Sequence, residues 1–217
     1  MSHWNIAAAQ YVPRHNCTGV HVKHHLRFIH AAARHNCDLL VFPELSLTGC
    51  AMDAAPLPEP PTEEALSPLM QAVQTSGMAV IAGTTITTRT GRKKGLLLFN
   101  PENDRPEHYL QGSGACLKPD AARLSILGHP ADVCLDPQAA LFTSPQSVTE
   151  TRWRDTISSL QHFAHRYAIA VLMANARGGS ALWDDQGQLV VRADKGELLL
   201  TGYRDRRGWQ GDIIPLR

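Results

Sequence analysis

The pattern of apolar and polar positions near the N-terminus predicts a strand, a helix and a second strand. Residues 5–10 and residues 38–42 are short apolar runs typical of buried strands. The segment between them has apolar side chains at helical spacing, at Val22, Leu26, Ile29 and Ala33. We therefore expect two parallel strands joined by a right-handed helical crossover. Functional side chains gather at the carboxyl ends of such strands.

The next segment carries signals for the beginning and the end of a helix. Pro68 suits the first helical position and Gly77 suits a helix end, which predicts a helix over residues 68–76. An apolar run over residues 78–82 follows, and it predicts a buried strand that ends at Gly83.

Turn residues separate the elements expected farther along the chain. Residues 95–99 and 107–110 bracket the turn-rich residues 100–104, which indicates antiparallel strands. Residues 153–167 have one apolar face at helical spacing, and residues 169–174 form an apolar strand. Parallel and antiparallel strands are therefore expected to be mixed.

The remaining segments are of two kinds. Residues 112–130 are rich in Gly, Pro and Ala and match no regular element. Shorter apolar runs predict strands over residues 133–135, 140–142, 180–184, 188–192 and 197–201. The last three are separated by turns that contain Gly, and we expect them to form a meander.

The composition of the chain indicates a globular protein and gives no sign of a nucleic-acid or membrane partner. The chain has 217 residues, 43% of them hydrophobic and 19% charged, which fits one globular domain over residues 1–217. A net charge of +1 gives no electrostatic reason to expect nucleic acid or an anionic membrane as a partner. No apolar run reaches the roughly 18 residues that span a bilayer, and no basic leader precedes the N-terminal run. We therefore expect a cytoplasmic protein with a small-molecule substrate or ligand.

The sequence indicates neither a metal nor a cofactor. Its five cysteines are scattered without a CxxC pair, so reduced thiols are expected. His21, His24 and His25 lie on the first helix, but no HExxH motif occurs, and we interpret them as solvated histidines of a helix face. Residues 112–114 form a Gly-Ser-Gly segment too short for a phosphate-binding loop.

Residues 39–49 contain the most specific motif in the chain. An apolar run ends at Pro43 and Glu44, and small or apolar residues then lead to Thr48 and Gly49. This stretch resembles the strand-end signature of the carbon-nitrogen hydrolase, or nitrilase, superfamily. Three further stretches are similar to the family: a first strand ending in Gln at residues 6–10, an apolar strand ending in Ala-Asn at residues 169–175, and a late hairpin at residues 179–191.

The resemblance implies a fold and a chemistry. The implied fold is α/β, a nitrilase-like α-β-β-α sandwich with mixed sheets face to face and helices outside, and the family commonly forms homodimers through those helices. The implied site is a Glu-Lys-Cys triad. In such a triad a thiolate attacks an amide or nitrile carbon, a carboxylate moves the proton, and an ammonium stabilises the oxyanion. Glu44 takes the position of the general base.

The lysine of such a site has one candidate in the sequence. Lys118 is the nearest lysine that follows the middle strands. The family usually presents its lysine directly after a strand, however, and the strand expected over residues 107–110 puts the uncharged Gln111 there. Lys118 as the oxyanion-stabilising group and Lys118 as a surface residue stay open alternatives.

Two alignments assign Cys134 differently. In the first, residues 133–136 match the family's apolar-Cys-Tyr-Asp elbow, and Cys134 is the nucleophile. In the second, residues 131–139 match a later family strand, Cys134 is a small buried hydrophobe, and the elbow is missing between about Lys118 and Pro130. Only 16 residues separate Lys118 from Cys134, which favours the second alignment and a domain abbreviated around residues 112–145.

The residues thus support two functional hypotheses. The first is a carbon-nitrogen hydrolase that acts on a small amide or related compound, with Glu44 as base, Lys118 as oxyanion stabiliser and Cys134 as nucleophile. The second is a degenerate member that has lost catalysis and serves as a ligand-binding or partner protein. Both hypotheses predict the same fold, and the sequence does not identify the substrate.

Overall fold

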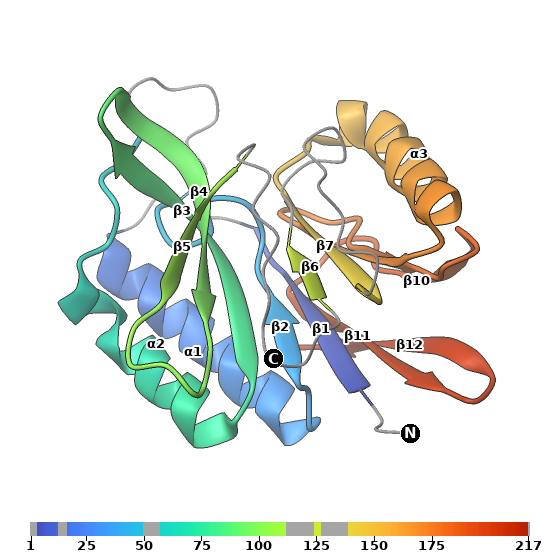
Figure 1. Ribbon diagram of the computed structural model, residues 1–217, viewed down its shortest axis with the longest axis horizontal. Coiled ribbons are helices and arrows are strands. Elements are labelled where there is room, and N and C mark those ends of the chain that lie inside the picture. The colour runs from blue at the N-terminus through green and yellow to red at the C-terminus, as the bar shows by residue number, and fades with distance from the viewer. Residues whose placement is uncertain (1–3, 13–16, 50–56, 112–123, 127–138, 217) are drawn as a thin grey trace.

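The computed structural model describes residues 4–12, 17–49, 57–111, 124–126 and 139–216. Two β-sheets pack face to face in this part of the chain, and helices cover their outer faces (Figure 1). Of these helices, α1 (Thr18–Arg34) and α2 (Glu63–Ser76) lie against one sheet, and α3 (Glu150–Tyr167) lies against the other. No helix among the described residues combines the length and the apolar character needed to cross a bilayer.

The larger sheet has the strand order β12-β11-β1-β2-β3-β4-β5. Within it, β1, β2 and β3 are parallel, and the other neighbours pair antiparallel. The bounds are β1 Trp4–Gln10, β2 Leu39–Val41, β3 Ala79–Thr88, β4 Gly91–Phe99, β5 Glu107–Leu110, β11 Leu198–Asp205 and β12 Gly208–Pro215.

The smaller sheet has the strand order β10-β9-β8-β7-β6. Its strands β6, β7 and β8 are parallel, whereas β9 and β10 join antiparallel. The bounds are β6 Leu124–Ile126, β7 Leu141–Gln146, β8 Ala170–Asn175, β9 Ala181–Trp183 and β10 Leu189–Arg192.

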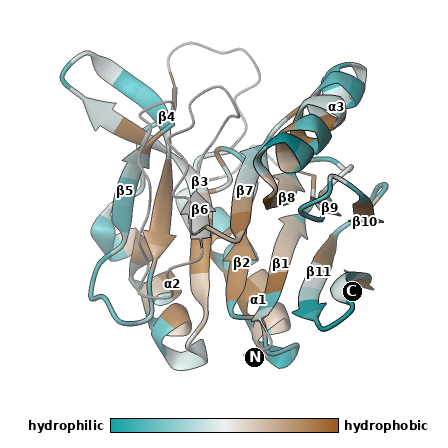
Figure 2. Cartoon of the chain, turned by 45° about the vertical axis from the view of Figure 1, so that its right-hand side comes forward, coloured by the Kyte–Doolittle hydropathy of each residue, from teal (hydrophilic) through white to brown (hydrophobic). Residues whose placement is uncertain are grey.

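Three apolar layers hold these elements together. One lies between the larger sheet and the helices α1 and α2, a second lies between the two sheets, and a third lies between the smaller sheet and α3. The hydrophobic colour in Figure 2 runs along the strands, and the hydrophilic colour marks much of α3. Layers of this kind confirm the expected α-β-β-α sandwich with mixed sheets.

Helix α2 begins earlier than the sequence predicted. The expected start at Pro68 is wrong, because the helix begins at Glu63, capped by the Thr62 hydroxyl, which accepts a hydrogen bond from the Ala65 N–H at 3.2 Å. Pro68 lies inside the helix. The predicted end is confirmed, since Gly77 caps the helix in the left-handed conformation with φ of 68°.

Strands β3 and β4 are longer than predicted. Gly83 does not end β3, which continues to Thr88 and pairs with β4 in a regular antiparallel register. Strand β4 begins at Gly91 instead of residue 95. The sequence signal was weak because three of the four added residues of β4 are charged, and the pairing with β3 fixes all four as strand.

The C-terminal strands do not form one meander. Strands β9 and β10 pair with each other as predicted, but β11 crosses to the larger sheet and pairs with β1 and β12. Strand β12 was not predicted. It is the edge strand of the larger sheet, and backbone pairing with β11 along one side holds it there, so β12 needs no apolar alternation of its own.

The strands before α3 bear on the two alignments of Cys134. The second alignment placed the strand that leads into α3 at residues 131–139. In the structure that strand is β7, which lies later in the chain. Strand β6 pairs with β7 and lies inside the interval that the second alignment treated as missing. The residues 133–135 and Cys134 itself lie outside the described residues.

Candidate functional site

Glu44 lies in a tight turn immediately after the carboxyl end of β2. The Phe42 N–H still donates to the Ile81 carbonyl at 2.8 Å, and the chain then turns at Pro43. Leu45 completes the turn with φ of 53°, the left-handed region that a buried leucine rarely adopts. Such strain persists only where surrounding contacts fix the backbone, and it clusters at functional sites.

Gly83 allows the turn to lie directly on β3. A Cβ on Gly83 would lie 2.3 Å from the Leu45 nitrogen and 2.4 Å from the Pro43 carbonyl oxygen. The Leu47 N–H also donates to the Gly83 carbonyl at 2.9 Å. Only glycine leaves room for this approach, so the identity of residue 83 sets the position of the Glu44 backbone.

A buried hydrogen-bond relay fixes the other side of the turn. His25 Nδ1 is 2.7 Å from the His21 carbonyl oxygen, which can only accept, so Nδ1 carries the proton. His25 Nε2 therefore accepts from the Ser46 hydroxyl at 3.0 Å, and that oxygen accepts from the Gly83 N–H at 3.1 Å. The relay joins α1 to β3 through the turn that carries Glu44.

Burial keeps the His25 imidazole neutral. Its side chain is fully buried and stacks on Phe42 with ring centroids 4.0 Å apart. Desolvation by burial lowers the pKa of His25 from 6.5 to about 3. The interpretation of His21 and His25 as solvated is wrong, because both are buried where α1 packs on the sheet.

The Glu44 carboxylate forms an ion pair with Lys94. Lys94 Nζ lies 2.9 Å from Glu44 Oε1, and the two side chains are 44% and 14% exposed, respectively. The carboxylate is thus mostly removed from water, and its ammonium partner reaches it from the solvent side. Hydrogen bonds between charged partners of this kind are stronger than those between neutral groups, so the ion pair holds the Glu44 side chain in place.

Lys94 belongs to the face of β4 that looks toward the smaller sheet. Leu96 and Leu98 pack in the layer between the sheets, and Lys94 shares their face because side chains alternate along a strand. Lys93 lies on the opposite face. The sequence did not single out Lys94, and the only available signal was its spacing of two residues from Leu96.

The smaller sheet approaches Glu44 from the other side. The Glu44 N–H donates to the carbonyl of Gln146, the last residue of β7, at 3.4 Å. Thr143 lies on the same strand, and its buried Oγ1 has no hydrogen-bond partner among the described residues. The same holds for Thr48 Oγ1 and Gln111 Oε1. Buried polar atoms left unpaired are rare and often mark functional sites.

Two residues singled out by the family resemblance support neighbouring loops. Gln10, at the end of β1, accepts from the Ser180 N–H at 3.0 Å. Asn175, at the end of β8, accepts from the Val148 N–H at 2.9 Å and donates to the Gly178 carbonyl at 2.7 Å. Both side chains are buried and fix backbone instead of facing a ligand.

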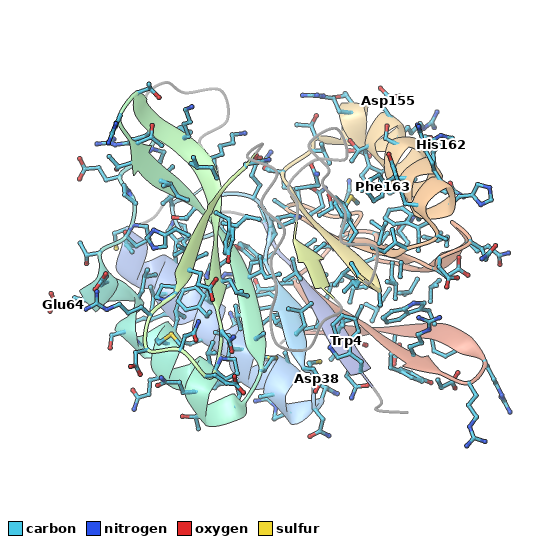
Figure 3. All side chains as sticks on the ribbon, in the orientation of Figure 1. Trp4, Asp38, Glu64, Asp155, His162 and Phe163 are labelled. Carbon is cyan, nitrogen blue, oxygen red and sulfur yellow. The ribbon has the colours of Figure 1, made fainter. Side chains whose placement is uncertain are left out.

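Of the three predicted site residues, the structure describes Glu44 alone. Lys118 and Cys134 lie outside the described residues. Two other thiols are described: Cys17 is exposed, and Cys37 is buried beside Asp38 at the start of β2, the opposite end of that strand from Glu44. Figure 3 shows Asp38 at this end, near Trp4 at the start of β1. Burial raises the pKa of Cys37 to about 11, which disfavours a reactive thiolate.

The arrangement around Glu44 is suited to proton transfer and to polar recognition. A carboxylate accepts hydrogen bonds and protons, and the adjacent ammonium donates hydrogen bonds to a carbonyl or an oxyanion. Among the described residues, no group of three or more His, Cys, Asp or Glu side chains is placed to hold a metal ion.

Comparison with known proteins finds a match over part of the chain to the family that the motif resembles. Residues 5–104 match the family model described as carbon-nitrogen hydrolase. The matched region contains both Glu44 and Lys94.

Solved structures share the fold at low sequence identity. An amidase from Nesterenkonia sp. matches with a TM-score of 0.72 and 20% identity, covering 92% of this chain and 89% of that chain. A carbon-nitrogen hydrolase superfamily protein from Xanthomonas campestris, with an arsenic adduct in its active site, has a TM-score of 0.77 and 16% identity over 95% and 92% of the chains. Glutamine-dependent NAD+ synthetase from Acinetobacter baumannii has a TM-score of 0.77 and 14% identity, covering 97% of this chain and 47% of that chain.

Proposed function

We propose that this chain is a member of the carbon-nitrogen hydrolase superfamily, whose family model matches residues 5–104, and that it hydrolyses the carbon–nitrogen bond of a small amide, with Glu44 as general base. The observation that carries this proposal is the mostly buried Glu44 carboxylate at the end of β2, held against an ammonium at 2.9 Å. The surrounding turn is fixed by Gly83 and by the His25 relay, which is the rigidity that a positioned base needs.

The proposed reaction has two steps and needs a thiol. Cys134 is the nucleophile in this proposal: Glu44 takes its proton, the sulfur attacks the amide carbonyl, and the proton passes to the departing amine to leave a thioester. Glu44 then activates water, which releases the carboxylic acid and restores the thiol. An ammonium stabilises the oxyanion of both tetrahedral intermediates, and Lys118 is the candidate that the sequence supplied.

The proposed substrate class follows from the two charged groups. A primary amide carries N–H donors beside a carbonyl acceptor, so one molecule can donate to the Glu44 carboxylate and accept from an ammonium. The fold likeness to an amidase supports the same class. Compounds without an N–H, such as N,N-dimethylacetamide, can accept from the ammonium but cannot donate to the Glu44 carboxylate.

A panel of small amides tests the proposed function. We expect the wild-type protein to release ammonia from acetamide or propionamide, and to release no amine from N,N-dimethylacetamide. Glu44→Gln keeps the shape but removes the base, and should lower kcat by about 100-fold or more. Cys134→Ser should lower it at least as far. Unchanged turnover in Cys134→Ser would reject that nucleophile, and turnover retained in Glu44→Gln would reject the base.

A second candidate function is binding without catalysis. It is favoured by the position of the described thiols, since Cys37 lies at the far end of β2 and Cys17 is exposed at the beginning of α1. In this alternative the protein is a degenerate member whose Glu44 site retains a small ligand. Ammonia release that depends on Cys134 would rule it out.

A further inference from the structure

We infer that Lys94 supplies the ammonium of this site from β4, in place of a lysine expected directly after β5. The catalytic role that this inference gives to Lys94 rests on the proposed amide hydrolysis. The ion pair with Glu44 is the first observation. Lys94 Nζ lies 2.9 Å from Glu44 Oε1, and this carboxylate has no other ion-pair partner among the described residues.

The second observation is the register between β4 and β5. Leu96 pairs with Tyr109 and Gly95 pairs with Leu110, so the next pair in this antiparallel register is Lys94 with Gln111. The Gln111 N–H donates to the Lys94 carbonyl at 3.0 Å, which confirms that these two residues lie opposite each other. Directly opposite residues have their Cβ atoms about 5 Å apart on the same face of a sheet. A long side chain on either residue can therefore approach the same carboxylate.

The third observation is that the side-chain oxygen of Gln111 is buried and unpaired among the described residues. The family resemblance places its lysine at this position, directly after β5, and the chain has an uncharged amide there. Gln111 Oε1 is buried without a hydrogen-bond partner among the described residues. An amide oxygen left unpaired in this way is unfavourable unless a donor completes the site. A substrate N–H is such a donor.

Lys94 is well placed to act on a bound amide. Its side chain is 44% exposed, so the ammonium lies at the boundary between solvent and the Glu44 carboxylate. From there it can donate one hydrogen bond to Glu44 and another to the carbonyl oxygen of the substrate. Negative charge grows on that oxygen as the tetrahedral intermediate forms, so the second hydrogen bond strengthens in the transition state.

The test compares two adjacent lysines of β4. Lys94→Met removes the charge and keeps most of the length. We expect it to lower kcat on propionamide by about 100-fold or more and to raise KM by only about five- to tenfold, because the hydrogen bond to the carbonyl oxygen forms in the bound amide and strengthens in the transition state. Lys93→Met removes an exposed charge from the opposite face of the same strand. It is the matched control and should leave kcat within about twofold.

An exchange variant separates a catalytic role from a structural one. Lys94→Gln combined with Gln111→Lys transfers the ammonium to the opposite residue of the same pair. We expect this double variant to recover at least about tenfold in kcat over Lys94→Gln alone, because the charge returns to the face of Glu44. A lysine that only stabilised β4 would show no such recovery.

Each outcome decides the assignment. Full turnover in Lys94→Met, or failure of the exchange variant to recover activity while it folds like the wild type, overturns the role of Lys94. Loss of turnover in Lys118→Met while Lys94→Met stays active assigns the ammonium to Lys118 instead. In both cases the proposed hydrolysis survives.

A binding measurement covers the case in which no amide is hydrolysed. Absence of turnover across the panel overturns the proposed hydrolysis, and propionamide binding, measured by ligand-observed NMR, then tests Lys94 alone. We expect binding to weaken at least about fivefold in Lys94→Met and to recover in the exchange variant. Binding that is absent in the wild type, or equal in all three proteins, overturns the inference.

Discussion

The buried side chain of His25, beside the candidate site, makes the stability of the protein depend on pH. The neutral imidazole donates to the His21 carbonyl and accepts from Ser46, so protonation would replace an accepting nitrogen by a second donor. Burial lowers the pKa of His25 to about 3, whereas the group titrates near 6.5 in the unfolded chain. The unfolded state therefore binds more protons between these two values.

The sign of the resulting pH dependence follows from this difference. The stability contributed by neutral His25 is complete above pH 6.5 and is lost as pH falls toward 3, with a slope of at most about 1.4 kcal/mol per pH unit. We expect the free energy of unfolding, measured by urea denaturation, to fall between pH 7 and pH 5. His25→Gln should flatten this dependence relative to the wild type. An equally steep dependence in the variant would show that other groups cause it.

At the residue scale, the position of Glu44 just after a strand could be predicted because the motif is local, whereas its role as a base stays a prediction. Pro43, Glu44 and Thr48 are close in sequence, and the strand end that they form could be expected from the sequence alone. Lys94 could not, because its contact with Glu44 depends on how β3 and β4 pair. The burial of His25 was missed for a similar reason, since its polar side chain is satisfied only by tertiary partners.

At the scale of elements, the close approach between β3 and the Glu44 turn gives a sharp test. Gly83→Ala places a Cβ where the Pro43 carbonyl and the Leu45 nitrogen now lie. Backbone must move to admit it, so we expect a loss of about 1–3 kcal/mol in the free energy of unfolding. Amide turnover should fall further than stability explains, because the turn carries Glu44.

Gly19→Ala is the matched control for this substitution. Gly19 lies in α1, and nothing lies within 4 Å of its added Cβ. Alanine favours a helix over glycine by about 0.5–1 kcal/mol, so stability should be unchanged or slightly higher and turnover unaffected. If Gly83→Ala behaves like Gly19→Ala, the turn has room that the structure does not show.

Prediction of elements failed chiefly at their ends. Helix α2 begins at Glu63 because Thr62 caps it and Glu63 and Glu64 suit its first turn. Pro68 was a misleading signal, since a proline in the sixth helical position costs one backbone hydrogen bond that the packing of the helix outweighs.

At the scale of the molecule, Gln10 links the two sheets. Its side-chain oxygen accepts from the Ser180 N–H, and its amide donates to the carbonyls of Asp194 and Gly196 at 3.3 and 3.4 Å. Gln10 ends β1 of the larger sheet, whereas Ser180 precedes β9 of the smaller one. The side chain is fully buried, so water does not replace these hydrogen bonds.

Truncation of Gln10 should therefore destabilise the sandwich. We expect Gln10→Ala to lower the free energy of unfolding by about 2–4 kcal/mol, since it leaves a buried N–H unpaired and opens a cavity. Gln71→Ala, at an exposed position of α2, should change it by less than about 0.5 kcal/mol. Chemical denaturation of both variants measures the difference, and equal values would contradict a role for Gln10 between the sheets.

From the sequence by itself, local periodicity predicted most of the strands, and the contiguous motif placed Glu44 at a strand end and implied the sandwich through its family resemblance. That the whole chain forms one domain stays a prediction, as do the roles of Lys118 and Cys134. Only the tertiary structure decided which cation meets Glu44. That contact joins residues 50 positions apart in the sequence, through strand register and a glycine that lets the turn lie on β3. Register is set by pairing between distant segments, so no local pattern specifies it.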